Sequence, residues 1–495
     1  MSGVNNEGFV QIEDLDQHAA DAHRPTMAER QRVDYRTIAK DVGRLGEGKQ
    51  YFIRTHGCQM NEHDTEIMAG MLEEMGYAPA NVIEDADFVL YNTCAVRENA
   101  EDKVFGHIGT LKPIKAKNPN LLIGLCGCMA QEEVVREKVR VKHPHVDIVF
   151  GTHNIHMLPE LIEQAHHSKE TIFEVWDAAQ GTVENLPKMR KDGVRAWVNI
   201  QYGCNKFCTY CIVPFTRGEE RSRLPEDILN ELRELAAEGY KEIYLLGQNV
   251  NDYGLDLGHI DFADLMDMAA GVEGIERIRF TTSNPWNFTD KLIDTIARHD
   301  KICNNIHLPA QSGNSQVLRR MKRGYTREEY LDLVERIKAR IPDVSLTTDI
   351  ITGFPGETEE QFQDTLSLLE TVRYDSAYTF IYSPRAGTPA TRLPDDVTEA
   401  EKKDRLLRLI GLQERITSEH AQEMVGKVYS VLVEGESKTN KNVLQARTES
   451  NKIVHIEGFT PDEIKSMVGQ MILAKIVESK TWNLRGELLP EGVTV

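Results

Sequence analysis

The stretch VNIQYGCNKFCTYC, at residues 198–211, places three cysteines directly after a short run of apolar and β-branched residues. Residues 198–202 are expected to form a strand, because Val, Ile and Tyr favour extended backbone. Cys204, Cys208 and Cys211 then lie on the loop that leaves this strand. Buried structural thiols and a zinc site are the alternatives, but structural zinc needs four ligands and no fourth Cys or His lies near. Three thiolates suit a [4Fe–4S] cluster and leave one iron open for a small molecule.

Short strands and amphipathic helices continue to alternate beyond this loop. The predicted strands are 198–202, 242–247, 277–283, 305–309, 346–353 and 377–383. Amphipathic helices are predicted between them, for example at 226–238, 326–340 and 358–372. Six such units predict an α/β fold, a partial (β/α)6 TIM-like barrel within a core domain at residues 190–420. The active site of such a barrel lies at the carboxyl ends of its strands.

A second strand–helix series precedes the core and carries the other cysteine set. Strands are predicted at 51–55, 87–93, 121–126 and 147–151, and a helix at 61–76, which indicates a Rossmann-like α/β domain at residues 49–165. Cys58, Cys94 and Cys128 each follow or end one of these strands, with Cys126 beside the last. Parallel sheets bring neighbouring strand ends together, so these thiols are expected to meet at one edge. The alternatives at this point are a second metal site or three unconnected thiols.

The remaining segments complete the predicted organisation. Residues 1–48 are polar and acidic and are expected to form a flexible or partly helical extension. A linker is placed at 166–193, and a charged helix at 398–424. Five short strands with turn residues between them then predict a small OB-like β-barrel at residues 423–486.

Composition excludes several classes of protein. The 78 acidic residues outnumber the 58 basic ones, which gives a net charge of −20 and excludes a uniformly basic nucleic-acid binder. A locally basic face is still allowed. Eight cysteines are too few for a disulfide scaffold of 495 residues, and we recognise no secretory signal. The longest uncharged apolar stretch, 121–130, is about half of a membrane span. We therefore expect a soluble cytoplasmic protein with reduced thiols and no membrane partner.

The C-x3-C-x2-C spacing, with Tyr210 before the last cysteine, resembles the signature of radical S-adenosylmethionine enzymes. This resemblance implies that the amino and carboxylate groups of S-adenosylmethionine chelate the open iron. It also implies that one electron from the cluster cleaves the sulfonium and releases a 5′-deoxyadenosyl radical. The partial barrel predicted above is the fold of that family.

The N-terminal stretches RTHGCQMN, YNTCAVRENAEDKVFG and GCMAQEE resemble the N-terminal domain of methylthiotransferases, which binds an auxiliary [4Fe–4S] cluster. By that resemblance Cys58, Cys94 and Cys128 are its ligands. Cys126 lies outside the matching motif, and we interpret it, like Cys303, as a small buried apolar residue.

Further motifs within residues 49–486 indicate which methylthiotransferase family the chain resembles. They are YGCNKFCTYCIVPFTRGEERSR, LLGQNVNDYG, HLPAQSGNSQVLRRMKRGYTREEY, DIITGFPGETEEQF and FIYSPRAGTPA. The chain is most similar to the MiaB family of tRNA methylthiotransferases, which convert N6-isopentenyladenosine beside the anticodon to its 2-methylthio derivative. The C-terminal barrel resembles a TRAM domain, an RNA-binding module. The implied partners are that tRNA, a reductant such as flavodoxin or ferredoxin, and a sulfur donor.

The resemblance also implies how two clusters are used. One S-adenosylmethionine methylates a sulfide held on the auxiliary cluster. A second, reduced at the other cluster, yields the radical that takes hydrogen from carbon 2 of the adenine, to which the methylthio group then transfers. Such C–H bonds resist acid–base chemistry, so a cofactor must carry the difficult step.

Other site residues are predicted by their position at strand ends. We expect Tyr210 and six residues at strand carboxyl ends to contact the cofactor: Gly247, Gln248, Asn249, Gln311, Ser312 and Asp349. The alternative is that they cap the helices that follow.

Basic residues concentrate in three stretches, which we expect to border one mouth and to anchor tRNA through its phosphates. They are Arg217, Arg221 and Arg223; Arg319, Arg320, Lys322, Arg323 and Arg327; and Lys427, Lys438, Lys441, Arg447 and Lys452. The alternative for any one stretch is an ordinary solvated helix face.

Two other functions compete with this prediction. A sister methylthiotransferase acts on threonylcarbamoyladenosine or on an aspartate of a ribosomal protein, although the stretches around Cys94 and Cys204 favour the isopentenyladenosine enzyme. A non-catalytic iron–sulfur RNA-binding protein or sensor has the same clusters but forms no 5′-deoxyadenosine.

Overall fold

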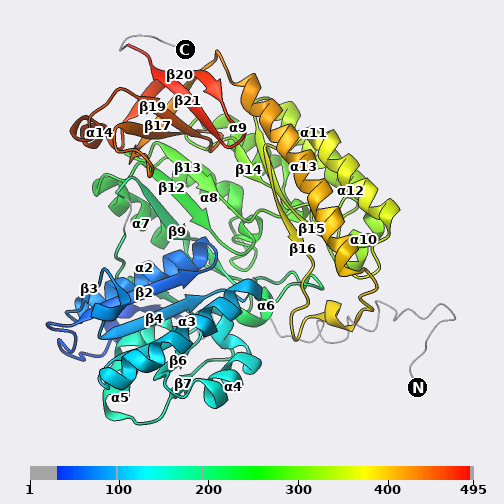
Figure 1. The fold of residues 1–495 in the computed structure, drawn as a ribbon. Helices are drawn as coiled ribbons and strands as arrows, with labels where there is room; N and C mark the ends of the chain where they lie inside the picture. Colours follow the sequence, from blue (N-terminus) through cyan, green and yellow to red (C-terminus); the bar gives the residue numbers. More distant parts are fainter. Residues whose placement is uncertain (1–30, 96–97, 180, 191–192, 491–495) are drawn as a thin grey trace.

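The computed structural model describes residues 31–95, 98–179, 181–190 and 193–490. Three folded parts follow one another along the chain, and the middle part lies between the other two (Figure 1). They are an N-terminal α/β domain, a partial parallel barrel and a small closed β-barrel, so the predicted fold class is confirmed. Among the described residues, no helix combines the length and apolar character that crossing a bilayer requires.

The N-terminal domain is a parallel sheet with helices on both faces. Its six strands run in the order β3-β2-β4-β5-β6-β7, with bounds Ala78–Pro79 (β3), Gln50–His56 (β2), Phe88–Thr93 (β4), Leu122–Cys126 (β5), Ile148–Phe150 (β6) and Ile172–Glu174 (β7). The sequence predicted the four central strands but not β3 and β7, because two or three edge residues leave no periodic signal. One face is covered by α2 (Gln59–Glu74) and α5 (Leu158–His167), the other by α3 (Glu98–Lys117) and α4 (Glu133–Lys142).

The expected polar extension at 1–48 needs a correction over its second part. Residues 1–30 lie outside the described residues. Strand β1 (Gln31–Asp34) pairs in parallel with β8 (Gly181–Glu184), which belongs to the expected linker. The short helix α1 (Tyr35–Ile38) follows, and the Tyr35 side chain is buried in the apolar core of the N-terminal domain. Residues 31–38 are therefore part of the folded protein. The buried Tyr35 ring and the pairing with β8 hold them in place.

The middle part is the partial barrel. Its six parallel strands form two groups, in the orders β13-β12-β9 and β14-β15-β16, with a single bridge from Ile278 to Ile302 between them. The bounds are Arg195–Asn199 (β9), Glu242–Leu246 (β12), Arg277–Phe280 (β13), Asn305–His307 (β14), Ser345–Thr352 (β15) and Ser376–Ile381 (β16). Between β9 and α7 lie the short pair β10 (Gln201–Tyr202) and β11 (Arg221–Ser222) and helix α6 (Val213–Thr216).

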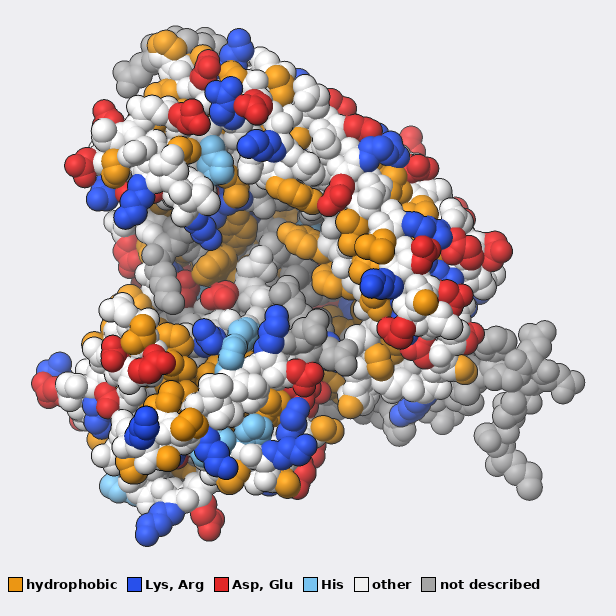
Figure 2. All heavy atoms as spheres, in the orientation of Figure 1, with side chains coloured by type: hydrophobic (Ala, Val, Ile, Leu, Met, Phe, Trp, Pro, Cys, Tyr) orange, Lys and Arg blue, Asp and Glu red, His pale blue; other side chains and the backbone are white. Residues whose placement is uncertain are grey.

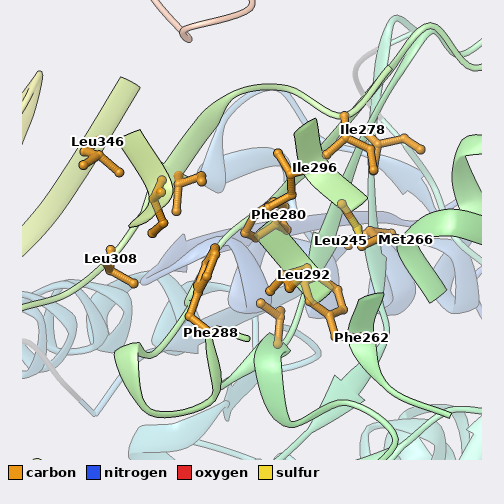
Figure 3. Close-up of a cluster of buried hydrophobic side chains, with 14 of the residues drawn as sticks. Leu245, Phe262, Met266, Ile278, Phe280, Phe288, Leu292, Ile296, Leu308 and Leu346 are labelled. Atoms are coloured by element: carbon orange, nitrogen blue, oxygen red, sulfur yellow. The ribbon is translucent and has the colours of Figure 1, made fainter. Parts of the chain in front are cut away.

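Helices cover the outside of these strands. They are α7 (Pro225–Ala237), α8 (Phe262–Ala270), α9 (Asp290–Arg298), α10 (Ser315–Arg320), α11 (Arg327–Arg340) and α12 (Glu359–Val372). Their apolar faces form one core with the outward side chains of the strands, including Leu245, Phe262, Phe280 and Leu292 (Figure 3). The cysteines of both sets lie outside this core, so packing leaves the strand ends available for chemistry.

Helix α13 (Glu399–Glu423) runs along the barrel and leads into the C-terminal domain (Figure 1). That domain is a closed barrel in the order β17-β18-β19-β21-β20, with strands Val428–Glu436 (β17), Val443–Thr448 (β18), Ile453–Glu457 (β19), Met471–Ser479 (β20) and Asn483–Leu488 (β21) and helix α14 (Pro461–Met467). The five predicted strands are all present.

The C-terminal barrel docks on the amino ends of the core strands. Arg277, the first residue of β13, donates from Nη1 to the Arg447 carbonyl (2.7 Å) and from Nη2 to the Ser430 carbonyl (2.9 Å). Arg279 donates in the same way to the carbonyls of Glu449 and Thr448. Charged donors satisfy backbone acceptors here. The C-terminal domain therefore closes the end of the barrel opposite to the cysteine loop.

Candidate active site

The Cys204–Cys208–Cys211 loop leaves β10 through a tight turn. Gly203 has a φ of +72°, and a Cβ at this position would lie 2.0 Å from the Glu219 carbonyl oxygen. The close approach allows the Cys204 amide to donate to the Gly218 carbonyl at 3.0 Å. Glycine is required because other residues disfavour this backbone conformation and have no room for a side chain.

The sulfur atoms of this loop lie in a buried environment beside a cation. Cys204 and Cys208 are buried, and burial raises the pKa of Cys211 to about 12. The Arg323 side chain is only 5% exposed and donates from Nη1 to Cys208 Sγ at 3.3 Å. It also donates to the Tyr325 hydroxyl and to the Pro309 carbonyl, both of which are neutral. A buried guanidinium of this kind is best compensated by an anionic centre at Cys208.

The second cysteine set meets at the carboxyl ends of three adjacent strands. Cys58 follows β2, Cys94 follows β4 and Cys128 lies just after β5, as the sequence predicted. The Cys94 amide donates to the His56 carbonyl at 2.8 Å, which ties the two loops together. A hydrogen bond with the Cys94 side chain lowers the pKa of Cys58 to about 5. These thiols are therefore connected through their contacts.

The segment that follows Cys211 contacts the second cysteine set through Arg217 and Ile212. The Arg217 side chain is buried, and it donates from Nε to Cys128 Sγ at 3.3 Å and from Nη2 to Asp64 Oδ2 at 2.7 Å. Ile212, the residue after Cys211, packs against Ala95 and Cys128 of the N-terminal domain. The two cysteine sets are thus neighbours, although they belong to different domains.

The donor set fits clusters better than single ions. Among the residues that the structure describes, no three His, Cys, Asp or Glu side chains converge closely enough for one metal ion. A [4Fe–4S] cluster carries each thiolate on a different iron, so its ligands stand further apart than the ligands of one ion. Each set offers three thiols, next to Arg217 in one case and Arg323 in the other. Both sets therefore suit a negatively charged cluster with one open iron.

A group of buried polar side chains lies at the carboxyl ends of the first barrel strands. The side-chain amides of Asn199, Gln201 and Asn249 and the Ser283 hydroxyl are buried and have no hydrogen-bond partner within the described residues. Because buried polar groups are normally paired, such a group indicates a polar ligand. Amide and hydroxyl groups suit the amino, carboxylate and ribose groups of S-adenosylmethionine.

Only part of this polar group was predicted from the sequence. Asn249 was predicted, and the neighbouring Gly247 lies where a Cβ would come within 3.5 Å of the Gln201 side chain. Gln248 is half-buried beside it. Asn199, Gln201 and Ser283 were not predicted, although a polar residue at the carboxyl end of a barrel strand is by its position a candidate site residue.

The other predicted cofactor residues are placed as follows. Tyr210 packs edge-on against Phe354, with ring centroids 6.5 Å apart. Gln311 has a φ of +68°, and its backbone bridges to β15. The Ser312 hydroxyl contacts Thr365 and accepts from the Asn314 amide, whereas the helix that follows is capped by Asn314 itself. Asp349 lies inside the barrel, with Oδ2 3.5 Å from His307 Nε2.

The structure corrects three of the predicted RNA contacts. Arg217, Arg223 and Arg323 are buried and are bound to groups of the protein itself. Arg223 donates to the carboxylates of Glu184 and Glu231. The sequence shows the charge of these arginines, which suits phosphate, but it does not show their burial.

The three basic stretches do not all border one mouth, because the third belongs to the C-terminal barrel. Arg320 donates to the Gly356 carbonyl and Arg447 to the Glu434 carboxylate, so both have internal partners. Arg319 and Lys441 are exposed, and Arg221 and Lys322 are half-buried. Lys441 and Arg447 belong to the C-terminal barrel, which docks at the end of the core opposite to the cysteine loop. RNA contact stays a prediction for the exposed and half-buried residues.

Comparisons with known proteins agree with this arrangement. The profile of the Radical SAM superfamily matches residues 198–369, that of the uncharacterized protein family UPF0004 matches 50–151, and that of the TRAM domain matches 422–489. A solved radical S-adenosylmethionine methyltransferase, TsrM from Kitasatospora setae, is similar in fold. It has a TM-score of 0.50 and 12% identity over 77% of this chain and 78% of that chain.

Curated relatives are much more similar in sequence. The tRNA-2-methylthio-N(6)-dimethylallyladenosine synthase of Geobacillus thermodenitrificans (strain NG80-2) is 56% identical over 93% of this chain and 87% of its own length. The enzyme of the same name from Bacillus subtilis (strain 168) is 54% identical over 92% of this chain and 89% of its own length. At this identity and coverage, the chain belongs to the tRNA-2-methylthio-N(6)-dimethylallyladenosine synthase family of radical S-adenosylmethionine enzymes.

Proposed function

We propose that this chain transfers a methylthio group to carbon 2 of N6-dimethylallyladenosine (isopentenyladenosine), next to the anticodon of tRNA. Family membership supports the reaction. The observation that carries the proposal is the contact of Ile212 with Ala95 and Cys128, because it makes the two cysteine sets neighbours at one end of the core. A base placed there is within reach of both.

The ligand assignment follows the two sets. Cys204, Cys208 and Cys211 hold the cluster that works with S-adenosylmethionine, and Cys58, Cys94 and Cys128 hold the auxiliary cluster. When bound, these groups supply the radical that activates the adenine C–H bond and the sulfur that is transferred. Arg323 and Arg217 supply positive charge beside the thiolates of the first and second set, respectively.

The protein's own groups position and enclose the reactants. The side chains of Asn199, Gln201, Asn249 and Ser283 have free hydrogen-bonding capacity to orient the polar groups of S-adenosylmethionine. The N-terminal domain contacts the cysteine loop through Ile212 and through the bond from the Thr152 hydroxyl to the Thr216 carbonyl (2.6 Å). This cover limits access of water, which would otherwise quench reactive species.

The substrate is a tRNA, as the family name and the TRAM domain support. The base must leave the stack of the anticodon loop to reach the site. Electrons must come from a reductant, for which flavodoxin or ferredoxin is suited, and sulfur from a separate donor. Since tRNA is the substrate, we place the reaction in the cytoplasm.

The test is nucleoside mass spectrometry of tRNA from a strain that lacks this chain. We expect loss of 2-methylthio-N6-isopentenyladenosine and accumulation of N6-isopentenyladenosine. Loss of the methylthio form of threonylcarbamoyladenosine alone would overturn the assignment in favour of the sister enzyme. Unchanged tRNA, together with no 5′-deoxyadenosine from the purified protein with dithionite and S-adenosylmethionine, would favour the non-catalytic alternative.

A further inference from the structure

Strand β16 carries two exposed aromatic side chains at the end of the partial barrel. Tyr378 is 59% exposed and Phe380 is 42% exposed, although both belong to a strand of the central part of the molecule. β16 is the last strand in the order β14-β15-β16. Exposed aromatic residues that share one strand face are uncommon on a surface without a partner.

Both side chains point to the inside of the barrel. Side chains alternate along a strand, so Tyr378 and Phe380 share one face, while α13 packs against β16 from the outside. The Tyr378 ring meets the His307 ring edge-on, with centroids 5.9 Å apart. His307 also bonds to Thr347 Oγ1 at 3.0 Å, and Thr347 belongs to the face of β15 opposite to that of the buried Thr348. The inside of the partial barrel is therefore accessible to solvent along β16.

The strand connects the C-terminal domain with the cysteine loop. Just before β16, Asp375 pairs with Lys452 of the C-terminal barrel at 2.8 Å. Just after it, Tyr382 packs against Phe354, which in turn contacts Tyr210 of the cysteine loop. Figure 2 shows a hollow between the domains, with hydrophobic side chains gathered on the wall where β16 lies in Figure 1. An RNA held by the C-terminal domain must pass this wall to reach the cysteine loop.

We propose that Tyr378 and Phe380 form a stacking platform for nucleobases of the anticodon loop that flank the target base. This inference rests on the proposed function and adds a binding surface to it. Unstacked RNA bases are typically held on aromatic side chains, each stack contributing about 1–3 kcal/mol. The polar groups beside the platform are His307, Thr347 and Asp349, which suit base edges or ribose hydroxyls better than phosphates.

The experiment measures binding of an anticodon stem-loop that carries N6-isopentenyladenosine to the reconstituted enzyme. We expect Tyr378→Ala and Phe380→Ala each to raise Kd by a factor between about 5 and about 150, as loss of one stack predicts. Tyr378→Phe and Phe380→Tyr should keep the wild-type Kd, since both retain a ring. The matched control is Leu407→Ala, which removes an equally exposed apolar side chain from α13.

A second measurement reports stacking itself. A stem-loop with 2-aminopurine in place of a base that flanks the target should lose fluorescence on binding to the wild type. The double variant Tyr378→Ala/Phe380→Ala should lose this quenching while it keeps its iron and its 5′-deoxyadenosine formation without RNA. Unchanged Kd and unchanged quenching in the double variant would overturn the proposal. Failure of the proposed function shows separately, as absence of methylthiolation by the wild type.

Discussion

Arg217 donates a hydrogen bond from Nε to the sulfur of Cys128 at 3.3 Å, across the boundary between the core and the N-terminal domain. The same guanidinium pairs with Asp64 at 2.7 Å, and both partners of that ion pair are buried. A buried pair is costly to form but far more costly to break on one side, because the remaining charge has no partner. Arg217 therefore ties the core electrostatically to the second cysteine set at this boundary.

Removal of Arg217 should destabilise the junction. Arg217→Ala is expected to lower the free energy of unfolding by about 3–5 kcal/mol, because the Asp64 carboxylate stays buried alone. The double variant Arg217→Ala/Asp64→Ala should be less destabilised than the sum of the single variants. Urea unfolding of the four proteins measures this coupling. Additive effects would mean that the pair does not act as a unit.

Iron content tests the two ligand sets. The reconstituted wild type is expected to hold about eight irons per chain, and Cys58→Ala/Cys94→Ala/Cys128→Ala about four, by the count of two clusters. Anaerobic iron and sulfide analysis provides the measurement. Cys126→Ala is the matched control, since Cys126 is buried against Met68 Sδ at 3.6 Å and should not bind iron. Eight irons in the triple variant would contradict the auxiliary site.

Arg323 should raise the reduction potential of a cluster bound at Cys208. Its guanidinium lies 3.3 Å from the sulfur in a buried site, so its charge favours the electron-rich, reduced form of a cluster bound there. Arg323→Gln is expected to shift the reduction potential by some tens of millivolts to more negative values, where 59 mV corresponds to a tenfold change for one electron. A redox titration followed by electron paramagnetic resonance measures the shift. Arg319→Gln, at an exposed position, serves as the control and should leave the potential unchanged.

Glu66 gives stability a defined pH dependence. Burial raises its pKa from 4.5 to about 7, which means that the folded state holds a proton that the unfolded state releases. The Glu66 contribution to stability therefore falls as the pH rises from about 4.5 to about 7 and stays constant above. The neighbouring titratable groups are His63, Lys188, Arg190, Glu231 and Glu62.

Glu66→Gln should remove the loss of stability that ionisation of the buried Glu66 carboxyl causes. Compared with the wild type, the variant is expected to gain stability progressively between pH 4.5 and 7, by at most about 3 kcal/mol at 1.36 kcal/mol per pKa unit. His63 acts in the opposite sense in both proteins, because burial lowers its pKa and its contribution falls as the pH drops below 6.5. The difference between the two unfolding midpoints as a function of pH isolates Glu66. A constant difference over this range would exclude the effect.

The strand–helix alternation and the cysteine spacing were sufficient to predict the architecture. Strands such as β4, β5 and β15 were found within one or two residues because they are long and strongly apolar or alternating. The edge strands β3 and β7 and the pairing of β1 with β8 were not predicted. Their residues are few, and their partners are far away in the sequence, so no local signal marks them.

The local chemistry of this protein is determined by its sequence alone. Cys204, Cys208 and Cys211 lie within eight residues, so a single loop holds the three thiols close together whatever the rest of the fold is. Only the tertiary structure decided what the arginines do. Arg217, Arg223 and Arg323 have charges that suit phosphate, but folding brings Asp64, Glu184 and the sulfur of Cys208 to them from distant positions in the sequence. A charge that is buried must be neutralised by what surrounds it, and burial is a property of the whole fold.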